Sequence, residues 1–373
     1  SPYPSPSAIP AARAITFFRD PPSSIPKTSG LEYTRNTSFI NVSCTNFAVC
    51  AVFAPTTTVV GSFDINLKKA ETFGDKVKSA LGLYDPYKIA VEEVVKFQLD
   101  AGLDIVGDGQ PRGDMVGSFV SHIPGFSYEM NSSVIVDKIK TPLEYIVLPD
   151  LKYAMSVLDK ELDKRNLSAE ERAKKGVKGI VTGPSTIVHS SRILSFYKSK
   201  EDAIIDLAHS LKYEVDAIAK KVKPIYIQID EPFLSTGMVY IGTAKEAISI
   251  LSEDIDIPVA MHVCGNLSDV FKDLLKFDID YLDCEFAGNN VNIGLLEENA
   301  DLIGDKKIGF GCLDSASNSV DEEDQVRALV ERGINAIGVE NMFLDPDCGL
   351  RKVDLPIAER KIKIMTDLAK ELE

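Results

Sequence analysis

Short runs of β-branched residues alternate with longer amphipathic stretches from about Thr56 to the end of the chain. This alternation is typical of βα units, which build a parallel sheet. One helix is predicted at residues 201–221, where apolar residues recur with helical spacing. The pattern predicts eight strands, at residues 57–63, 104–110, 179–185, 224–231, 258–265, 281–287, 307–314 and 342–345.

Eight βα units in succession favour an α/β fold of the (β/α)8 type, a TIM barrel, as a single domain over residues 56–373. The connection at 127–178 is too long for one crossover, so we interpret it as an insertion between the second and third strands. Within it the pattern predicts a strand at 133–138 and a charged helix at about 158–175. Residues 1–55 are rich in proline and lack an apolar period, which predicts a disordered or loosely attached extension.

Composition narrows the classes of partner. The chain has 373 residues, and 41 lysines and arginines against 56 aspartates and glutamates give a net charge of −15. Such a chain repels phosphate backbones, so we expect no nucleic-acid partner. No apolar run reaches the roughly 18 residues that a membrane span needs, so no membrane role is expected. The six cysteines are scattered, which indicates free thiols and a cytoplasmic location.

Polar residues gather where the predicted strands end. Because the carboxyl ends of barrel strands meet at one mouth, we expect these side chains to form the functional site. They are Gly61, Ser62, Asp108, Gln110, Asp230, Glu231, His262, Cys264, Glu285, Asp314, Asp347 and Cys348.

Four of these strand-end residues have the chemistry of metal ligands. His262 and Cys264 lie two apart on one strand, so their side chains share a face. Glu285 ends the next strand and Cys348 follows the last one. Two thiolates, an imidazole and a carboxylate favour one Zn²⁺ ion per chain. A zinc ion with this ligand set predicts the alkylation of a thiol bound as thiolate. The alternative is a buried cysteine beside a hydrogen-bonded histidine.

Several motifs together resemble the catalytic domain of cobalamin-independent methionine synthase, most closely its short archaeal single-barrel form. The resemblance runs from about Thr56 to the C-terminus. The motifs are Thr-Thr-Val-Val-Gly-Ser-Phe at 57–63, Asp-Gly-Gln-Pro-Arg-Gly-Asp-Met at 108–115, Gln-Ile-Asp-Glu-Pro at 228–232, His-Val-Cys-Gly at 262–265, Asp-Cys-Glu-Phe-Ala-Gly around Glu285 and Asp-Pro-Asp-Cys-Gly-Leu at 345–350.

The resemblance implies a role for each site residue. It makes His262, Cys264, Glu285 and Cys348 the zinc ligands, and it assigns no further catalytic residue. It places the homocysteine carboxylate at Val60, Gly61 and Ser62, and the amino group at Gln110 and Asp230. Independently of the resemblance, a strand-end Gly-Ser offers N–H and O–H donors to an anion, although Gly61 could equally mark a tight turn. Asp230 could likewise cap the segment that follows.

Departures from the long, folate-using enzymes point to a different methyl donor. Those enzymes have a glutamate where this chain has Gln110, a tryptophan at Ser190, an acidic folate contact at Thr236 and a proton-donating histidine at Ala316. Methylcobalamin leaves as cob(I)alamin without a proton, whereas the folate nitrogen must be protonated. We therefore expect a methyl-corrinoid as co-substrate, carried on a corrinoid protein.

Two alternatives stay open. Zinc activates any thiol, so the acceptor could be another thiol such as coenzyme M, or the chain could be a non-catalytic, zinc-stabilised scaffold that binds thiols. Arg112 and Asp114 could touch substrate, but we favour an ion pair between them beneath the site. Cys284 and Cys312 are expected in the core.

Overall fold

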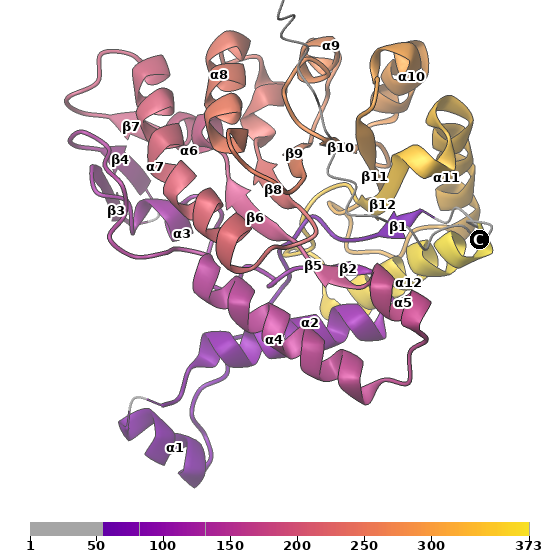
Figure 1. Ribbon diagram of the computed structural model, residues 1–373, viewed down its shortest axis with the longest axis horizontal. Coiled ribbons are helices and arrows are strands. Elements are labelled where there is room, and N and C mark those ends of the chain that lie inside the picture. The colour runs from indigo at the N-terminus through magenta and orange to yellow at the C-terminus, as the bar shows by residue number, and fades with distance from the viewer. Residues whose placement is uncertain (1–54, 82, 131, 373) are drawn as a thin grey trace, which may run out of the picture. The chain divides into compact units, whose positions relative to one another are not determined.

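The computed structural model describes residues 55–372 except Gly82 and Asn131, so the predicted extension at 1–55 lies outside the described residues apart from Pro55. Seven strands form one parallel sheet in the order β1-β12-β11-β10-β9-β8-β6 (Figure 1). Their bounds are Thr56–Thr57 (β1), Gly179–Thr182 (β6), Ile227–Asp230 (β8), Val259–Val263 (β9), Tyr281–Glu285 (β10), Lys307–Leu313 (β11) and Met342–Pro346 (β12).

The second predicted strand, β2 (Ile105–Val106), pairs in parallel with β5 (Gly176–Val177). Lys178 alone separates β5 from β6. On the other side of β2, the Asp104 N–H donates to the Thr57 carbonyl at 3.2 Å. The eight predicted strands are therefore all present, and the α/β class with a curled parallel sheet is confirmed. The first two strands are much shorter than predicted, because their polar ends are loops.

The helices pack around this sheet (Figure 1). None of the described helices is long and apolar enough to cross a membrane. The predicted helix at 201–221 is present as α7; Ser199 caps it, and its apolar face is buried. The helices are α1 (Phe73–Ala80), α2 (Pro86–Asp100), α3 (Gly117–Val120), α4 (Leu148–Lys164), α5 (Ala169–Lys174), α6 (Pro184–His189), α7 (Lys200–Lys221), α8 (Ile241–Ser252), α9 (Phe271–Leu274), α10 (Asn290–Glu298), α11 (Glu323–Ile337) and α12 (Leu355–Glu371), with short 3-10 turns η1 (Pro232–Thr236), η2 (Ala300–Leu302) and η3 (Val339–Asn341).

The connection at 127–178 is an insertion only in part. Its first portion forms a hairpin of β3 (Phe126–Glu129) and β4 (Ser132–Ile135), and β4 pairs with β7 (Ser191–Ile193). The rest holds α4, which packs against α2 and α7 as an ordinary crossover helix, and β5. The strand predicted at 133–138 corresponds to β4.

The charged helix predicted at 158–175 was wrong as a single helix. The chain leaves the helical conformation at Arg165 and restarts at Ser168. The Ser168 hydroxyl accepts from the Glu171 N–H, and the Glu171 carboxylate accepts from the Ser168 N–H. This capping box starts a new helix, α5, in the middle of a stretch whose composition is helical throughout.

Buried carboxylates fix the starts of two helices near the carboxyl ends of the strands. Glu214 on α7 accepts the N–H groups of Ile146, Val147 and Leu148 at 2.8–3.0 Å, which satisfies the first turn of α4. Glu231, at the end of β8, accepts from the N–H groups of Ser185 and Thr186 at the start of α6. The Glu214 contacts tie the start of α4 to α7, and the Glu231 contacts tie the start of α6 to the end of β8.

The interior of the sheet is polar beneath its carboxyl end. Lys178 is fully buried, and its Nζ donates to Gln228 Oε1 at 2.6 Å. Asp283 and Asp345 are also buried there and line a small cavity with Gln228. Burial lowers the pKa of Lys178, while the charges of Asp283 and Asp345 oppose that shift. A buried lysine therefore stands beside two buried aspartates directly below the strand ends.

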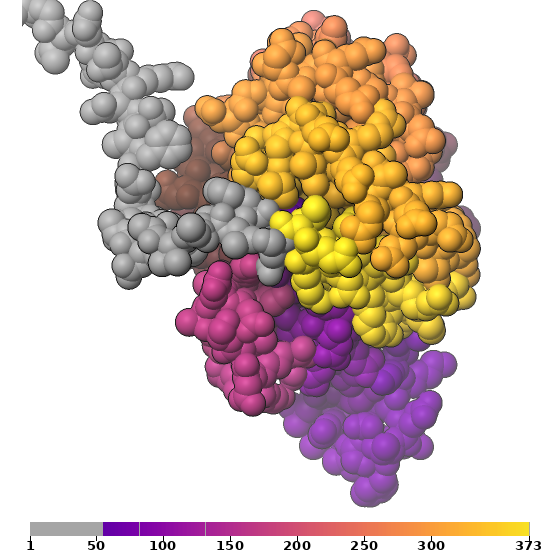
Figure 2. Space-filling view, turned by 90° about the vertical axis from the view of Figure 1, so that its right-hand side faces the viewer, coloured from indigo at the N-terminus to yellow at the C-terminus, as the bar shows by residue number. Residues whose placement is uncertain are grey.

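Helix α1, like the short α5, has no buried residue. Its Phe73 side chain is 85% exposed. The α1 segment projects from the lower end of the molecule in both views, away from the continuous surface that the C-terminal helices form in Figure 2. The core of the fold does not depend on this segment.

Candidate metal centre and substrate site

Three of the four predicted metal ligands meet in one cluster. Strand β9 carries His262 at its end and Cys264 just beyond it, and Cys348 follows β12. One ligand atom from each of the three lies within 4.8 Å of the others. His262 is buried, and the two cysteines are half-buried and free. Groups far apart in the sequence therefore face one point at the mouth of the sheet.

The spacing of the two sulfurs fits a tetrahedral metal. Cys264 Sγ and Cys348 Sγ are 3.9 Å apart. Two thiolates on one zinc ion, each about 2.3 Å from it in tetrahedral geometry, are separated by about 3.8 Å. The residues present thus fit a zinc ion without a large rearrangement.

His262 is oriented by a carboxylate behind it. Its Nδ1 lies 3.0 Å from Asp283 Oδ2, on the neighbouring strand β10. This contact leaves Nε2 as the nitrogen available to a metal, an arrangement common in zinc sites. Burial is the largest single effect and opposes protonation, but the charge and contact of Asp283 together with the contacts of Cys264 and Cys348 outweigh it and raise the pKa of His262. A metal that binds here has to displace a proton.

The two thiols differ in their tendency to ionise. The neighbouring Cys264 lowers the pKa of Cys348, and His262 adds to the shift. Cys264 shows the opposite direction, since sharing a proton with Cys348 raises its pKa. One thiolate is therefore available at neutral pH, and a thiolate is the form that binds metal.

Glu285, the fourth predicted ligand, stands beside the cluster. Its Oε2 accepts from the Gly265 N–H at 2.7 Å, and its Oε1 accepts from the Asn289 amide. Gly265 follows Cys264 directly, so the carboxylate lies next to the loop that carries a cluster sulfur. Its role as a ligand stays a prediction.

The loop after β1 approaches both the cluster loop and the core. The Val60 carbonyl accepts from Gln228 Nε2 at 2.9 Å. The Ser62 carbonyl accepts from the Leu350 N–H at 2.7 Å, and a Cβ atom at Gly349 would lie 2.1 Å from Ser62 Oγ. Only a glycine after Cys348 allows the Ser62 hydroxyl to lie this close to the cluster loop.

Gln110 is held at the same place in a left-handed backbone conformation, with φ of 50°. Its N–H donates to Asp108 Oδ1 at 3.0 Å, and its carbonyl accepts from Arg351 Nη2 at 2.7 Å. Its side chain faces Gly61, since a Cβ atom there would lie 3.6 Å from Gln110 Cδ. Two contacts from different loops therefore fix this unusual residue.

Asp230 ends β8 and accepts from Gln228 Nε2 at 2.7 Å. Burial raises its pKa to about 6, and the nearby His262 limits the rise. Gln228 thus joins Asp230 to the Val60 carbonyl. The predicted substrate residues Val60, Gly61, Ser62, Gln110 and Asp230 therefore lie on neighbouring loops and strand ends around the cluster.

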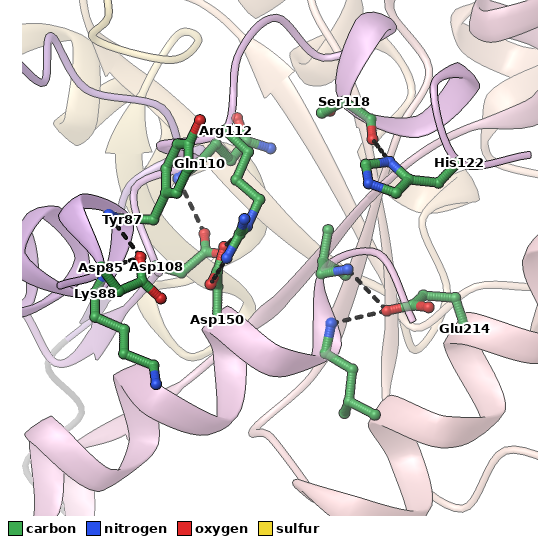
Figure 3. Close-up of polar contacts among 12 residues, drawn as sticks. Asp85, Tyr87, Lys88, Asp108, Gln110, Arg112, Ser118, His122, Asp150 and Glu214 are labelled. Atoms are coloured by element: carbon green, nitrogen blue, oxygen red, sulfur yellow. Dashed lines mark hydrogen bonds and ion pairs between the residues drawn. The ribbon is translucent and has the colours of Figure 1, made fainter. Parts of the chain in front are cut away.

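Arg112 and Asp114 do not pair with each other, so that prediction was wrong. Arg112 Nη2 donates to Asp150 Oδ1 at 2.8 Å, and its guanidinium lies 4.5 Å from the centre of the Tyr87 ring (Figure 3). Asp114 instead accepts from the N–H groups of Val116 and Gly117 before α3. Asp150 lies in the first turn of α4, which sequence motifs did not single out.

A cavity of about 30 Å³ lies beside Arg112, between Asp108, Gln110, Phe119 and Asp150. It has room for about two water molecules. Asp108 lines it and lies close to Asp150 (Figure 3), and burial raises the pKa of this carboxyl to about 6, with the charge of Asp150 adding to the rise.

An Asp108→Asn variant should remove part of the pH dependence of folding. The unfolded carboxyl ionises near pH 3.8 and the folded one near pH 6, so the folded state holds the extra proton between these values. The stabilising contribution of the protonated Asp108 carboxyl is fully present below about pH 4 and is lost as the pH rises through 6. Urea unfolding measures this effect. As the pH rises from 4 to 7, the free energy of unfolding of the variant should increase relative to that of the native protein by on the order of 3 kcal/mol. A constant difference across this range would contradict the assignment.

Several remaining predictions can be placed. Cys284 and Cys312 are buried in the core, as expected. Ser190 at the end of α6, Thr236 at the end of η1 and Ala316 in the loop after β11 are all exposed. Sequence reasoning missed Asp283 and Arg351. Asp283 could have been predicted from the sequence, because it lies two residues before Glu285 on a strand and so points to the same face.

The fold and the cluster together define an α/β protein that carries a candidate metal centre at the carboxyl ends of its parallel strands. Comparison with known proteins identifies the family. Residues 54–371 match the family described as cobalamin-independent synthase, catalytic domain, and the chain belongs to this family. The resemblance seen in the motifs is thereby confirmed.

Named relatives agree with this membership. The chain is 43% identical over 317 residues to a methionine synthase of Methanothermobacter marburgensis, covering 84% of this chain and 99% of that protein. It is 41% identical over 325 residues to a methionine synthase of Methanocaldococcus jannaschii, covering 84% and 98%. A solved B12-independent methionine synthase from a Shewanella species shares the fold, with a TM-score of 0.70, 19% identity and coverage of 85% and 97%.

Proposed function

We propose that the chain is a zinc-dependent methyltransferase that transfers a methyl group from a methyl-corrinoid to the thiol of homocysteine, forming methionine. The observation that carries the proposal is the cluster of His262, Cys264 and Cys348, whose sulfurs have tetrahedral spacing. The archaeal relatives named methionine synthase support the choice of reaction.

His262, Cys264 and Cys348 would hold the zinc ion, with Glu285 as the fourth ligand. Zinc bound to two thiolates lowers the pKa of an added thiol, which then binds as a nucleophilic thiolate. Residues of the protein orient the ligands and keep the site accessible for this chemistry. Asp283 orients His262, and the half-buried positions of the cysteines leave them accessible from the mouth.

The amino-acid part of homocysteine would lie on the loops beside the cluster. The Ser62 hydroxyl and the N–H groups near Gly61 offer donors to the carboxylate, and Asp230 and the Gln110 amide offer acceptors to the ammonium. Asp230 is buried and hydrogen-bonded to Gln228, so it is held in place before substrate arrives. This arrangement supports a substrate that has both a thiol and an amino-acid end.

A methyl-corrinoid fits the departures from the folate-using enzymes. The cobalt–carbon bond breaks with both electrons left on cobalt, and the thiolate sulfur forms the new bond to the methyl carbon. No proton is needed on the leaving group, which agrees with Ala316 at the position of the missing histidine. Ser190 and Thr236 are exposed, which leaves the mouth open to a corrinoid carried on a protein.

We further propose that the sheet is a complete (β/α)8 barrel. The contacts of β2 with Thr57 on one side and β5 on the other support closure, and β5 leads into β6 through Lys178. The free cysteines among the described residues support a cytoplasmic location.

One assay tests the proposal. Zinc-loaded protein is incubated without oxygen with methylcobalamin and either homocysteine or coenzyme M, and cob(I)alamin formation is followed. We expect turnover with homocysteine. Turnover with coenzyme M but not with homocysteine would identify coenzyme M as the methyl acceptor. No turnover, with zinc X-ray absorption unchanged by homocysteine, would indicate the non-catalytic scaffold.

Arg351→Met should weaken homocysteine binding specifically. The variant loses the guanidinium that donates to the Gln110 carbonyl, so Gln110 is no longer held toward the substrate ammonium. We expect KM for homocysteine to rise about tenfold, with kcat within twofold and zinc content unchanged. Arg332→Met, which removes an exposed ion pair with Glu297 on the outer helices, is the control. An unchanged KM in Arg351→Met would refute the role of Arg351.

A further inference from the structure

Asp347 connects two loops that carry predicted zinc ligands. It directly precedes Cys348, and its side chain is 2% exposed. Its Oδ1 accepts from the N–H groups of Phe286 and Ala287 at 2.9 Å, and its Oδ2 accepts from the Gly288 N–H at 2.6 Å. These three groups follow Glu285 immediately, so one carboxylate fixes the loop after β10 to the loop after β12.

Asn292 on α10 makes the corresponding connection on the other side. Its Nδ2 donates to the Gly265 carbonyl at 2.8 Å and to the Glu285 carbonyl at 2.6 Å. Its Oδ1 accepts from the Leu267 N–H at 3.0 Å. The side chain is fully buried, and it bridges the loop after Cys264 to the end of β10.

These contacts lie at the strand ends, where the regular pairing of β10 with β11 stops and only the Gly311 carbonyl still accepts from the N–H groups of Phe286 and Ala287. Cys264 and Cys348 lie in the loops after β9 and β12, Glu285 is the last residue of β10, and metal–ligand distances tolerate errors of only about 0.2 Å. The packing leaves little freedom, because a Cβ atom at Gly288 would lie 2.6 Å from Glu285 Oε1 and 3.1 Å from Asp347 Oδ2. The separation of the ligand groups therefore depends on the two connecting side chains.

We propose that Asn292 and Asp347 are positioning residues of the metal centre, which set zinc affinity by fixing the three ligand-bearing loops relative to one another. The inference rests on the proposed function, because it takes the cluster to be a zinc site. Neither residue is a ligand. Removing partners that orient metal ligands lowers metal affinity by about 10- to 100-fold.

The test is the zinc affinity of Asn292→Asp, measured by competition with a chromophoric chelator at pH 7. This variant has the same shape and keeps the acceptor for the Leu267 N–H, but it loses both donations to carbonyls. We expect affinity to fall 10- to 100-fold. The matched control is Asn299→Asp, since Asn299 is also buried and donates to a carbonyl of the same helix, at Leu295, away from the ligand loops.

A second pair of variants tests Asp347. Asp347→Asn turns one acceptor into a donor opposite three N–H groups and should lower zinc affinity by a similar factor. Glu214→Gln is its control. Glu214 is a buried carboxylate on α7 that also accepts three N–H groups, but these belong to the start of α4 and not to the ligand loops (Figure 3). Zinc X-ray absorption should show altered zinc–sulfur distances in Asp347→Asn and native distances in Glu214→Gln.

The outcomes separate this inference from the proposed function. If the native protein binds no zinc, both fail. If it binds zinc and transfers methyl groups while Asn292→Asp and Asp347→Asn match it in affinity, the positioning role alone is overturned. Equal losses in the controls would also overturn it, since they would reflect general destabilisation. Should Asn292→Asp not fold, Asn292→Ser decides in its place, with the same affinity criterion.

Discussion

Cys264→Ala should lose bound zinc and methyl transfer together. The variant removes one of two sulfurs that lie 3.9 Å apart and leaves His262, Cys348 and Glu285. Structural zinc sites are worth at least about 10 kcal/mol over four ligands, so losing one thiolate should weaken zinc binding by at least about 100-fold. Without the metal the acceptor thiol keeps its ordinary pKa and remains mostly protonated at pH 7. Metal analysis per chain and anaerobic cob(I)alamin formation measure the two effects.

Cys312→Ala is the matched control for this variant. Cys312 is buried in β11, outside the cluster. Its removal should cost about 1 kcal/mol of stability from the lost burial while zinc content and turnover stay native. Turnover that survives Cys264→Ala would remove the basis of the proposed mechanism.

Lys178→Met should produce the largest loss of stability. The fully buried ammonium donates to Gln228 Oε1 and stands among the carboxylates of Asp283 and Asp345. Methionine fills a similar volume but leaves the Gln228 oxygen without its donor and removes the attraction between Lys178 and Asp345, while Asp283 keeps His262 beside it. Leaving a buried acceptor without its donor costs about 1–3 kcal/mol. Urea unfolding at pH 7 should show a loss of this size.

A second substitution tests the cause of that loss. Adding Asp345→Asn to Lys178→Met removes one of the buried acids that Lys178 neighbours and should restore about 1 kcal/mol or more. Lys370→Met, which disrupts an exposed pair with Asp367, should change stability by less than about 0.5 kcal/mol. If Lys178→Met is no more harmful than Lys370→Met, Lys178 does not balance the buried carboxylates.

Sequence reasoning succeeded where the end of a strand determines the edge of the sheet at which a side chain lies. In a parallel sheet every strand delivers its last residue to the same edge, so His262, Cys264 and Cys348 could be expected together without knowing how the strands are ordered. The two-residue spacing of His262 and Cys264 added a shared face. The resulting cluster is the one that the structure forms.

Contacts between loops could not be predicted in this way. Asn292 and Arg351 act through backbone groups that are distant in sequence, and no periodic pattern marks such a partner. Arg112 illustrates the same limit, because the nearest carboxylate in sequence was assigned to it and the structure supplies Asp150 instead. The break at Ser168 was missed because a serine followed by glutamates can either cap a helix or continue one.

The closeness of Cys264 and Cys348 also has a redox consequence. A shift of roughly 2 Å would bring the sulfurs to bonding distance, so a mild oxidant can join them as a disulfide. Because the same electron pairs bind the ion, occupancy by zinc and oxidation exclude each other. Protein exposed to air during chelation should accumulate an inactive, cross-linked form, and a thiol reductant would have to act before the ion could return.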